Sequence, residues 1–268
     1  MPLAICATPI GNLDDVTLRV LAELRDADLV LCEDTRRTRI LLDRHGIAAR
    51  LESYHRHNEA AKTSRVLVRL RERERIALVS DAGLPGVNDP GARLIAAAVR
   101  AGHEVTVLPG ASAVETALVA SGLGADRYQF VGYLPRRAGE LRAFVESLGR
   151  WPGAVVAFES PRRLPGSLRA LADASPGRSA AVCRELTKRY EEVVRGSLEE
   201  LAARFAEPPR GEVTLVLGPA EGSSEPADDQ ALSAVSELVE AGASRRTAAE
   251  VVAKLTGASR NALYRDSL

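Results

Sequence analysis

The sequence predicts an α/β protein with two α/β domains and a small helical extension near its C-terminal end. Short apolar runs, many of them β-branched, alternate with longer amphipathic segments, which is typical of βαβ units around a mostly parallel sheet. The 268 residues suffice for two domains, and a hydrophobic content of 46% can give each a core. A polar segment rich in Gly, Pro, Ser and Glu then separates these domains from three short helical patterns.

The first predicted domain comprises residues 1–110. Its helical patterns cover residues 16–24, with Asp14 and Asp15 as candidate caps, and Arg93–Arg100 after the Asp89-Pro90 pair. Its apolar strand candidates are Leu3–Ala7, Leu29–Cys32, Ile76–Ser80 and Glu104–Leu108.

The second predicted domain comprises residues 111–218 and starts with a helix at Ala111–Ser121. Few segments near its end are long enough for a crossover helix, so we expect a mixed sheet with some antiparallel pairing. The strand candidates are Gln129–Val131, Ala154–Phe158, Ser179–Arg184, Glu191–Arg195 and Glu212–Leu217.

Residues 219–230 form a predicted linker, and residues 231–268 form the helical extension. The helical patterns of the extension are Ala231–Ala241, Arg245–Thr256 and Ser259–Arg265. Glycine ends the first two patterns, and serine follows as the next N-cap. Three short helices with tight turns resemble a helix-turn-helix module, although a small packing appendage would give the same pattern.

Composition excludes several classes of protein. The 36 basic and 36 acidic residues cancel, which excludes a uniformly basic nucleic-acid binder. Cys6, Cys32 and Cys183 lie in apolar runs, as expected for core thiols of a reduced intracellular protein. The four histidines lack metal-ligand spacing, so no metal site is predicted. With no leader-like start and no stretch of ~18 apolar residues, we expect a cytoplasmic protein without a membrane anchor.

Two loops lie at the carboxyl ends of predicted parallel strands, where open α/β sheets bind ligands. The segment Thr8–Asp15 lacks the glycines of a dinucleotide or P-loop site. The segment Ser80–Gly91 contains three glycines and two prolines after the strand, more constraint than an ordinary connection needs. Within it we expect Asp81 to contact a ligand and Asp89 to cap the next helix.

Further polar clusters end other predicted strands. Small residues in Pro109–Ala113 would let a ligand approach a helix N-terminus. The mixed-charge segments Glu33–Arg37 and Arg184–Arg189 are placed for a cleft, although such clusters are often surface ion pairs.

Six ordered motifs together resemble the small-subunit ribosomal RNA cytidine 2′-O-methyltransferases of the tetrapyrrole-methylase superfamily. The resemblance covers nearly the whole chain, including the helical extension. The motifs are Thr8–Leu13, Glu33–Arg36, Ser80–Gly83 with Asp89–Gly91, Pro109–Ala113, Phe158–Arg163 and Arg184–Lys188. Leu84 and Tyr133 depart from the Thr and Phe that are common at their positions.

The resemblance implies two α/β domains of the class III methyltransferase type, a homodimer, and S-adenosylmethionine in the cleft between the domains. It implies a cytidine of the decoding region as substrate, in the small ribosomal subunit or its RNA. By analogy with the superfamily, the cofactor would contact Pro9, Ile10, Gly11, Asp81, Leu84, Ser112, Ala113, Phe158, Glu159 and backbone near Leu217.

A ribose 2′-hydroxyl is a poor nucleophile while protonated, so a general base should help. Lys188 is the one lysine inside a motif, and burial near Arg184 would lower its pKa and allow it to act as this base. The carboxylate alternatives are Glu33, Asp34 and Glu185.

Two other functions remain open at this stage. A tetrapyrrole methyltransferase would keep the fold but would need an apolar trough and no RNA-binding module. A ligand-sensing helix-turn-helix regulator would need more basic residues in the extension than it has. Residues 36–75 carry 12 basic and 5 acidic side chains, whereas residues 190–240 carry 3 and 12. This segregation allows a basic face for phosphate contacts and favours an RNA substrate.

Overall fold

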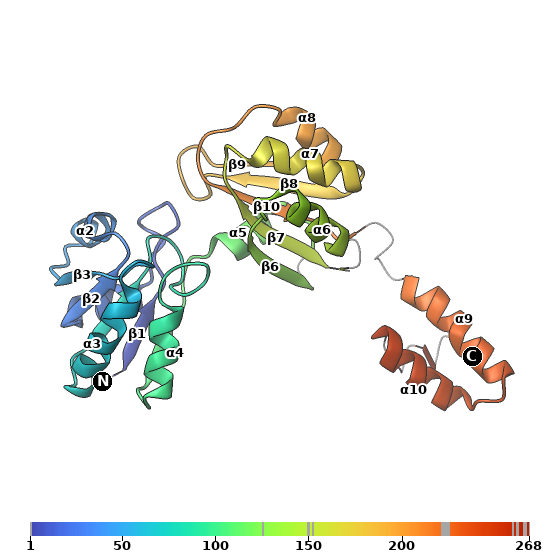
Figure 1. The fold of residues 1–268 in the computed structure, drawn as a ribbon, viewed down its shortest axis with the longest axis horizontal. Coiled ribbons are helices and arrows are strands. Elements are labelled where there is room, and N and C mark those ends of the chain that lie inside the picture. The colour runs from blue at the N-terminus through green and yellow to red at the C-terminus, as the bar shows by residue number, and fades with distance from the viewer. Residues whose placement is uncertain are drawn as a thin grey trace.

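The computed structural model describes residues 2–124, 126–148, 151, 153–220, 226–258, 260, 263–264 and 267. Two five-stranded sheets follow one another along the chain, each with its own helices. A pair of helices near the C-terminal end is set apart from both sheets (Figure 1). The α/β fold class predicted from the sequence is confirmed.

The first sheet is entirely parallel and has the strand order β3-β2-β4-β1-β5. Helices cover both faces, so the central strands are buried on both sides and are continuously apolar. The elements are β1 (Leu3–Cys6), α1 (Leu18–Asp26), β2 (Leu29–Cys32), α2 (Thr35–Arg44), β3 (Leu51–Ser53), α3 (Glu59–Arg71), β4 (Ile76–Val79), α4 (Ala92–Arg100) and β5 (Val105–Leu108).

The second sheet has the order β6-β7-β10-β8-β9 and is mixed. Only β6 and β7 are parallel, and β10 pairs antiparallel with both β7 and β8, which confirms the expected antiparallel pairing. The elements are α5 (Ala113–Ser121), β6 (Tyr128–Tyr133), α6 (Ala138–Leu148), β7 (Ala154–Glu159), α7 (Leu164–Ala174), β8 (Ser179–Arg184), β9 (Glu192–Ser197), α8 (Leu198–Arg204) and β10 (Val213–Leu217).

Alternate residues of the second sheet face two different cores. Ala154 and Val156 of β7 pack with residues of α5, whereas Val155 and Ala157 pack with residues of α6, α7 and α8. This alternation is the two-residue period of a strand. Among the helices of the described residues, α5 packs on one face of this sheet, and α6, α7 and α8 pack on the other.

Two predicted helix caps are wrong. Thr17, and neither Asp14 nor Asp15, caps α1 by accepting a hydrogen bond from the amide of Val20. Gly91 occupies the N-cap position of α4, without a side-chain hydrogen bond, so Asp89 is not the cap. Both expected caps lie in long loops, and the helices start later than the nearest acidic residue.

The three cysteines are buried and unpaired, as the apolar runs predicted. Burial, followed by the charge of Glu23, raises the pKa of Cys6 to about 12. Burial also raises the pKa of Cys183 to about 11. These thiols belong to the cores of the two sheets.

The C-terminal helices are α9 (Pro226–Glu240) and α10 (Arg245–Thr256), which pack on one another through residues such as Val235 and Val252. Because α9 begins at Pro226, residues 226–230 of the predicted linker 219–230 are helical. Proline suits the first turn of a helix, where its missing amide is not needed. Ser244 caps α10 as expected. Residues 221–225 and much of the pattern Ser259–Arg265 lie outside the described residues.

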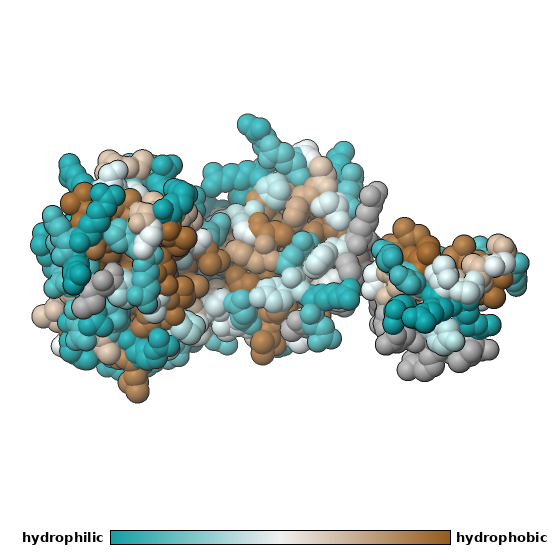
Figure 2. All heavy atoms as spheres, turned by 90° about the horizontal axis from the view of Figure 1, so that it is seen from below, coloured by the Kyte–Doolittle hydropathy of each residue, from teal (hydrophilic) through white to brown (hydrophobic). Residues whose placement is uncertain are grey.

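Hydrophobic side chains also reach the surface. Figure 2 shows them among hydrophilic ones on the face seen from below. Large exposed examples lie on separate helices, such as Leu18 on α1, Val119 on α5 and Leu255 on α10. Scattered residues of this kind are normal on a protein surface. None of the helices in the described part of the chain is long and apolar enough to cross a membrane.

Candidate active site

The loop after β1 meets the turn after β8, and this contact joins the two sheets. The amide of Asn12 donates to Thr187 Oγ1 at 3.0 Å. A Cβ on Gly11 would lie 2.5 Å from Lys188 Cγ and 2.8 Å from the carbonyl oxygen of Leu186. Because this approach leaves room only for glycine, two motifs distant in the sequence form one wall of a common site.

The loops after β1, β2 and β4 are also tied together. Thr8 and Gly83 exchange two backbone hydrogen bonds of 2.9 and 3.0 Å. Thr8 Oγ1 donates to the carbonyl oxygen of Ser80 at 3.0 Å. Asp81 Oδ1 accepts from the amide of Asp34 at 3.0 Å. The carboxyl ends of three parallel strands therefore present one connected surface.

A cavity of about 270 Å³ lies between these segments. Its lining is apolar at Pro9, Ile10 and Leu41, and polar at Thr8, Asp81 and Lys188. This combination of apolar walls with a few polar groups is typical of small-molecule sites. A more open hollow of about 450 Å³ is also lined by Gly11, Leu13 and Lys188, and additionally by Arg44 and Arg189.

Backbone strain gathers around the site. Among described residues other than glycine, four have a positive φ, and three of these lie in the segments just described: Glu185 (52°), Thr187 (63°) and Asn88 (62°). Residues with a Cβ rarely adopt this conformation. It costs about 1–3 kcal/mol at each position and is found most often at functional sites.

An apolar cluster lies against the same loops. Ile10 of the first loop packs in one cluster with Ala113 and Phe158. The Phe158 ring stands edge-on to Phe130 and Tyr133, with centroids 4.9 and 5.7 Å away. The second sheet thus contributes aromatic surfaces beside the polar loops of the first.

Lys188 is held by two carboxylates. Its Nζ donates to Glu185 Oε1 at 2.9 Å and to Glu212 Oε2 at 2.8 Å. Burial acts to lower the pKa of Lys188, but these hydrogen bonds and charges outweigh it and the pKa is raised. Arg184 pairs with Glu192 instead, at 2.8 Å. The expectation of a lowered pKa is therefore wrong, and Lys188 is a cation at neutral pH.

A profile of the family described as Tetrapyrrole (Corrin/Porphyrin) Methylases matches residues 2–202. The chain belongs to the tetrapyrrole methylase family. A relative named "Ribosomal RNA small subunit methyltransferase I" from Mesorhizobium japonicum is 46% identical over 267 residues, covering 98% of this chain and 90% of the relative. Its namesake from Micromonospora olivasterospora is 45% identical and covers 98% and 85%. These relatives confirm the resemblance found in the motifs.

Several solved structures share the fold. Diphthine synthase superposes with a TM-score of 0.65 at 17% identity, covering 81% of this chain and 90% of that one. Uroporphyrin-III C-methyltransferase from Thermus thermophilus, complexed with S-adenosylhomocysteine, gives 0.57 at 21% identity, with 83% and 99% covered. The predicted class III methyltransferase fold is thereby confirmed.

Six of the ten residues that were predicted to contact the cofactor lie close together in the structure. Four of them line the cavity, and Ala113 and Phe158 join Ile10 in the adjacent apolar cluster. The four are Pro9, Ile10, Gly11 and Asp81.

The other predicted cofactor residues are placed differently. Leu84 packs against the core of the first sheet, and the Ser112 hydroxyl donates to Glu115. Glu159 is buried, and its carboxylate accepts from the Ser160 amide at 2.6 Å and from Ser167 Oγ at 2.5 Å. These side chains are already engaged within the protein.

Leu217 is not brought to the others. The residue of β10 that pairs with Glu159 is Val213, whereas Leu217 pairs with Val155 at the opposite end of β7. Four residues of strand correspond to about 13 Å. Leu217 is buried in the core beneath α6, α7 and α8.

The carboxylates predicted as catalytic differ in their surroundings. Asp34 caps α2 and pairs with Arg36 at 2.6 Å. These hydrogen bonds lower the pKa of Asp34 to about 2. Hydrogen bonding by the Glu212 amide lowers the pKa of Glu185. In contrast, burial, followed by the charge of Asp81, raises the pKa of Glu33.

Three residues near the site were given no role in it from the sequence. Burial, followed by the charges of Glu33 and Asp81, raises the pKa of Asp89 to about 6. Arg56 donates to the carbonyl oxygen of Asn88 at 2.6 Å. Burial, followed by the charges of Glu212 and Asp89, raises the pKa of Tyr133. Asp89 lies in a loop that the sequence singled out, and Tyr133 was noted only as a departure from the family's usual Phe. Nothing in the sequence connected Arg56 with the site.

Proposed function

We propose that this protein is an S-adenosylmethionine-dependent methyltransferase that 2′-O-methylates a cytidine in the decoding region of small-subunit ribosomal RNA. The observation that carries this proposal is the 46% identity, over 98% of the chain, to a ribosomal RNA small subunit methyltransferase. The target nucleotide and its 2′-oxygen come from the motif resemblance.

The cavity between the two sheets fits the proposed cofactor. Bound S-adenosylmethionine supplies a methyl group on a positively charged sulfur. Pro9, Ile10 and Gly11 would hold it on the first loop and Asp81 on the second, since all four line the cavity. The carboxylate of Asp81 can accept hydrogen bonds from an amino group or from hydroxyls. The apolar surfaces of Ile10 and Phe158 suit the adenine.

The protein's own groups would orient the ribose and move its proton. In the overall reaction an oxygen–carbon bond forms, the sulfur–carbon bond breaks, and the hydroxyl proton passes to a base. Holding both reactants in line in a dry site supplies much of the acceleration. Among the predicted residues, Glu33 is best suited to take the proton, because its raised pKa lies closer to neutrality. Lys188 supplies a fixed positive charge rather than a base.

A tetrapyrrole substrate is the weaker alternative. The uroporphyrin-III C-methyltransferase is only 21% identical over 83% of this chain, so it supports the fold alone. A ligand-sensing regulator is weaker still, because the ribosomal RNA methyltransferases match nearly the whole chain rather than its helical extension.

The test uses S-adenosylmethionine labelled in its methyl group and three acceptors: unmethylated small ribosomal subunits, free ribosomal RNA and a tetrapyrrole. We expect label on the RNA of the subunits, at a cytidine ribose, so that one phosphodiester bond resists alkaline hydrolysis. Label on the tetrapyrrole, on a base rather than a ribose, or on none of the acceptors would contradict the proposal. Comparison of subunits with free RNA shows which is the substrate.

Two further properties are proposed from the family resemblance. The protein would be a homodimer, and it would work in the cytoplasm, where small subunits are assembled. Light scattering of the purified chain tests the first property, with a mass near 57 kDa expected, twice the 28.6 kDa of one chain.

A further inference from the structure

A second basic region lies outside the cavity, on the face of the second sheet that α6 and α7 cover. A groove of about 770 Å³ runs between these helices and the segments leading into them. Five arginines and two acids line it. We infer that this groove binds phosphodiester groups of the RNA whose ribose is methylated, an inference that rests on the proposed function.

The arginines of the groove are free to bind a ligand, with one exception. Arg136, Arg142, Arg162 and Arg169 are exposed, and none of their guanidinium groups forms an ion pair or hydrogen bond with the part of the chain that the structure describes. Arg163 differs, because it pairs with Glu159 at 3.3 Å and donates to the carbonyl oxygen of Pro135 at 2.7 Å. Arg163 therefore links the segment after β6 to the segment after β7 and stabilises the groove.

Two of these arginines are followed, one helical turn later, by an acidic residue with which they form no ion pair. Glu146 follows Arg142 on α6 and Asp173 follows Arg169 on α7, four residues on in each case, and neither pair is within ion-pair distance. Such pairs would contribute only ~0.3–0.5 kcal/mol on a helix surface. The guanidinium groups consequently remain available to phosphate, which matches their planar geometry.

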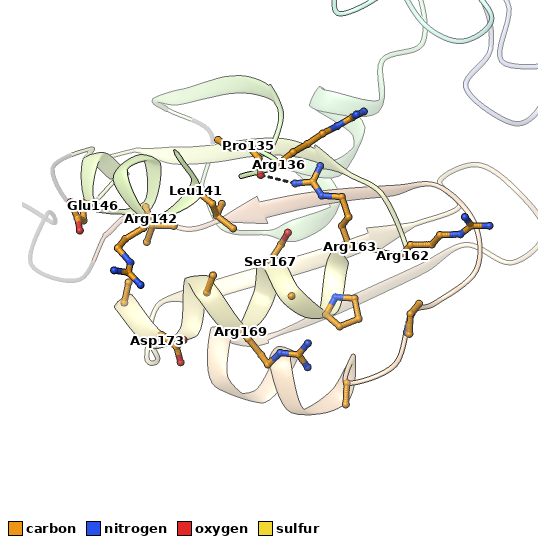
Figure 3. A pocket seen from close by; sticks show the side chains of 17 residues that line it. Pro135, Arg136, Leu141, Arg142, Glu146, Arg162, Arg163, Ser167, Arg169 and Asp173 are labelled. Atoms are coloured by element: carbon orange, nitrogen blue, oxygen red, sulfur yellow. Dashed lines mark hydrogen bonds between the residues drawn. The ribbon is translucent and has the colours of Figure 1, made fainter. Parts of the chain in front are cut away.

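Basic charge is concentrated toward one end of the groove. In Figure 3, Arg136 and Arg162 lie toward this end, whereas Arg142 lies at the other end beside the acids Glu146 and Asp173. A phosphate chain would therefore be attracted most strongly at the end that holds Arg136 and Arg162. This arrangement favours one direction of approach over uniform binding of any anion.

The attractive end adjoins the proposed active site. Arg136 follows Tyr133 at the end of β6, and Arg162 follows Glu159 at the end of β7. The centroid of the Tyr133 ring lies 5.7 Å from that of Phe158, and burial, followed by the charges of Glu212 and Asp89, raises the pKa of Tyr133. Since β6 and β7 are parallel, both chain segments leave the sheet at the edge that faces the cavity. RNA held in the groove would thus continue toward the ribose that reacts.

The test replaces four arginines together, Arg136→Gln, Arg142→Gln, Arg162→Gln and Arg169→Gln, and leaves Arg163 in place. The full-length protein is titrated with unmethylated small subunits between 50 and 200 mM KCl. Each phosphate contact contributes about 0.7–0.9 to the slope of log affinity against log salt. We expect the slope to fall by about 3, so that over this range the wild type loses about 50- to 150-fold more affinity than the variant.

Two matched variants isolate the groove. Arg25→Gln with Arg100→Gln removes exposed arginines from the last turns of α1 and α4, and we expect it to keep the wild-type slope. The fourfold Arg→Lys variant keeps the charges and should recover most of the slope. Affinity for S-adenosylmethionine, measured by calorimetry, should be unchanged in all three.

An unchanged slope and affinity in the fourfold Gln variant would overturn the inference. So would a fall in slope of about half that size in the Arg25/Arg100 control, which removes two charges rather than four, because the effect would then reflect total charge. Both results are distinguishable from failure of the proposed function, in which the wild type would transfer no methyl group to RNA.

Discussion

Of the residues that the sequence offered as general base, we propose Glu33 rather than Lys188. The sequence singled out Lys188 as a base because it is the one lysine inside a motif. The structure surrounds it with Glu185 and Glu212, which no spacing rule could reveal because Glu212 is 24 residues away. Glu33, by contrast, lies where burial and Asp81 raise its pKa.

We therefore predict that Glu33→Gln lowers the single-turnover rate of methyl transfer by about 10²–10⁴, the usual contribution of a general base. In the wild type the rate of methyl transfer should rise with pH as Glu33 loses its proton. The variant should not show this rise. Calorimetry with S-adenosylmethionine provides the control, since the glutamine keeps the shape of the site. A variant with the wild-type rate and pH profile would exclude Glu33 as the base.

Asp89 should affect stability in a pH-dependent way. Its pKa is raised to about 6 in the folded protein by burial, followed by the charges of Glu33 and Asp81, whereas an unfolded aspartate titrates near 3.9. Between these two values the folded state binds more protons, so the contribution of Asp89 to stability falls as pH rises from about 4 to about 6.

Asp89→Asn should consequently stabilise the protein at pH 7–8, by about 1–2 kcal/mol after allowance for the partial exposure of the side chain. The gain should disappear near pH 4, where both forms are neutral. Urea unfolding at several pH values measures it. A gain of the same size at every pH would show that removal of the charge is not its cause.

At the scale of elements, apolar strands were predictable and charged helices were not. The strands β1, β2 and β4 are continuous apolar runs, and their ends were predicted within one residue. The helix α2 was missed, since its ten residues TRRTRILLDR bury only Thr38, Leu41 and Leu42. β3 was missed because it is three residues long and includes Glu52.

These omissions limited the prediction of the sites. The loops after β1 and β4 were found because their strands are apolar and their turns are rich in glycine and proline. The arginine groove could not be found, since it depends on α6 and α7, and neither helix had been predicted. The position of a loop follows from the strand before it. The position of a groove can be predicted only when both helices that form it, and their packing, are known.

The helix α8 allows a prediction at this scale. Ser197 ends β9 and caps α8 by accepting from the amide of Glu200, whose side chain accepts in turn from the Ser197 amide at 2.8 Å. Ser197→Ala should lower the free energy of unfolding by about 1 kcal/mol, the usual value of such a cap. Ser147→Ala on α6, where the hydroxyl donates only to a carbonyl oxygen in its own helix, should change it by less than about 0.5 kcal/mol. Equal effects of the two changes in urea unfolding would contradict this role of the cap.

At the scale of the whole molecule, the proposed activity depends on how the two sheets meet. The sequence predicted that several loops would share one edge of the first sheet, because parallel strands end together. It also placed the turn after β8, Arg184–Arg189, at a cleft, but it could not predict the close contact of this turn with the loop after β1. That contact rests on Gly11 and on the positive φ of Thr187, a residue that usually avoids this conformation.

Gly11→Ala tests this contact directly. The added methyl group would lie 2.5 Å from Lys188 Cγ, which can move, but also 2.8 Å from the carbonyl oxygen of Leu186, which belongs to the backbone. Relieving the clash must separate the loop from the turn and weaken the hydrogen bond between Asn12 and Thr187. Overpacking of this kind costs about 1–3 kcal/mol. Because both segments line the cavity, we expect the Kd for S-adenosylmethionine to rise about 5- to 150-fold.

The matched control is Gly139→Ala in the first turn of α6, where a Cβ would meet nothing within 4 Å. It should leave cofactor affinity unchanged and stabilise the helix slightly, since alanine is the better helix former. If Gly11→Ala binds the cofactor like the wild type, the loop and the turn can separate without damage to the site. The cavity would then depend on the loops of the first sheet alone, and the second sheet would serve chiefly to hold the RNA.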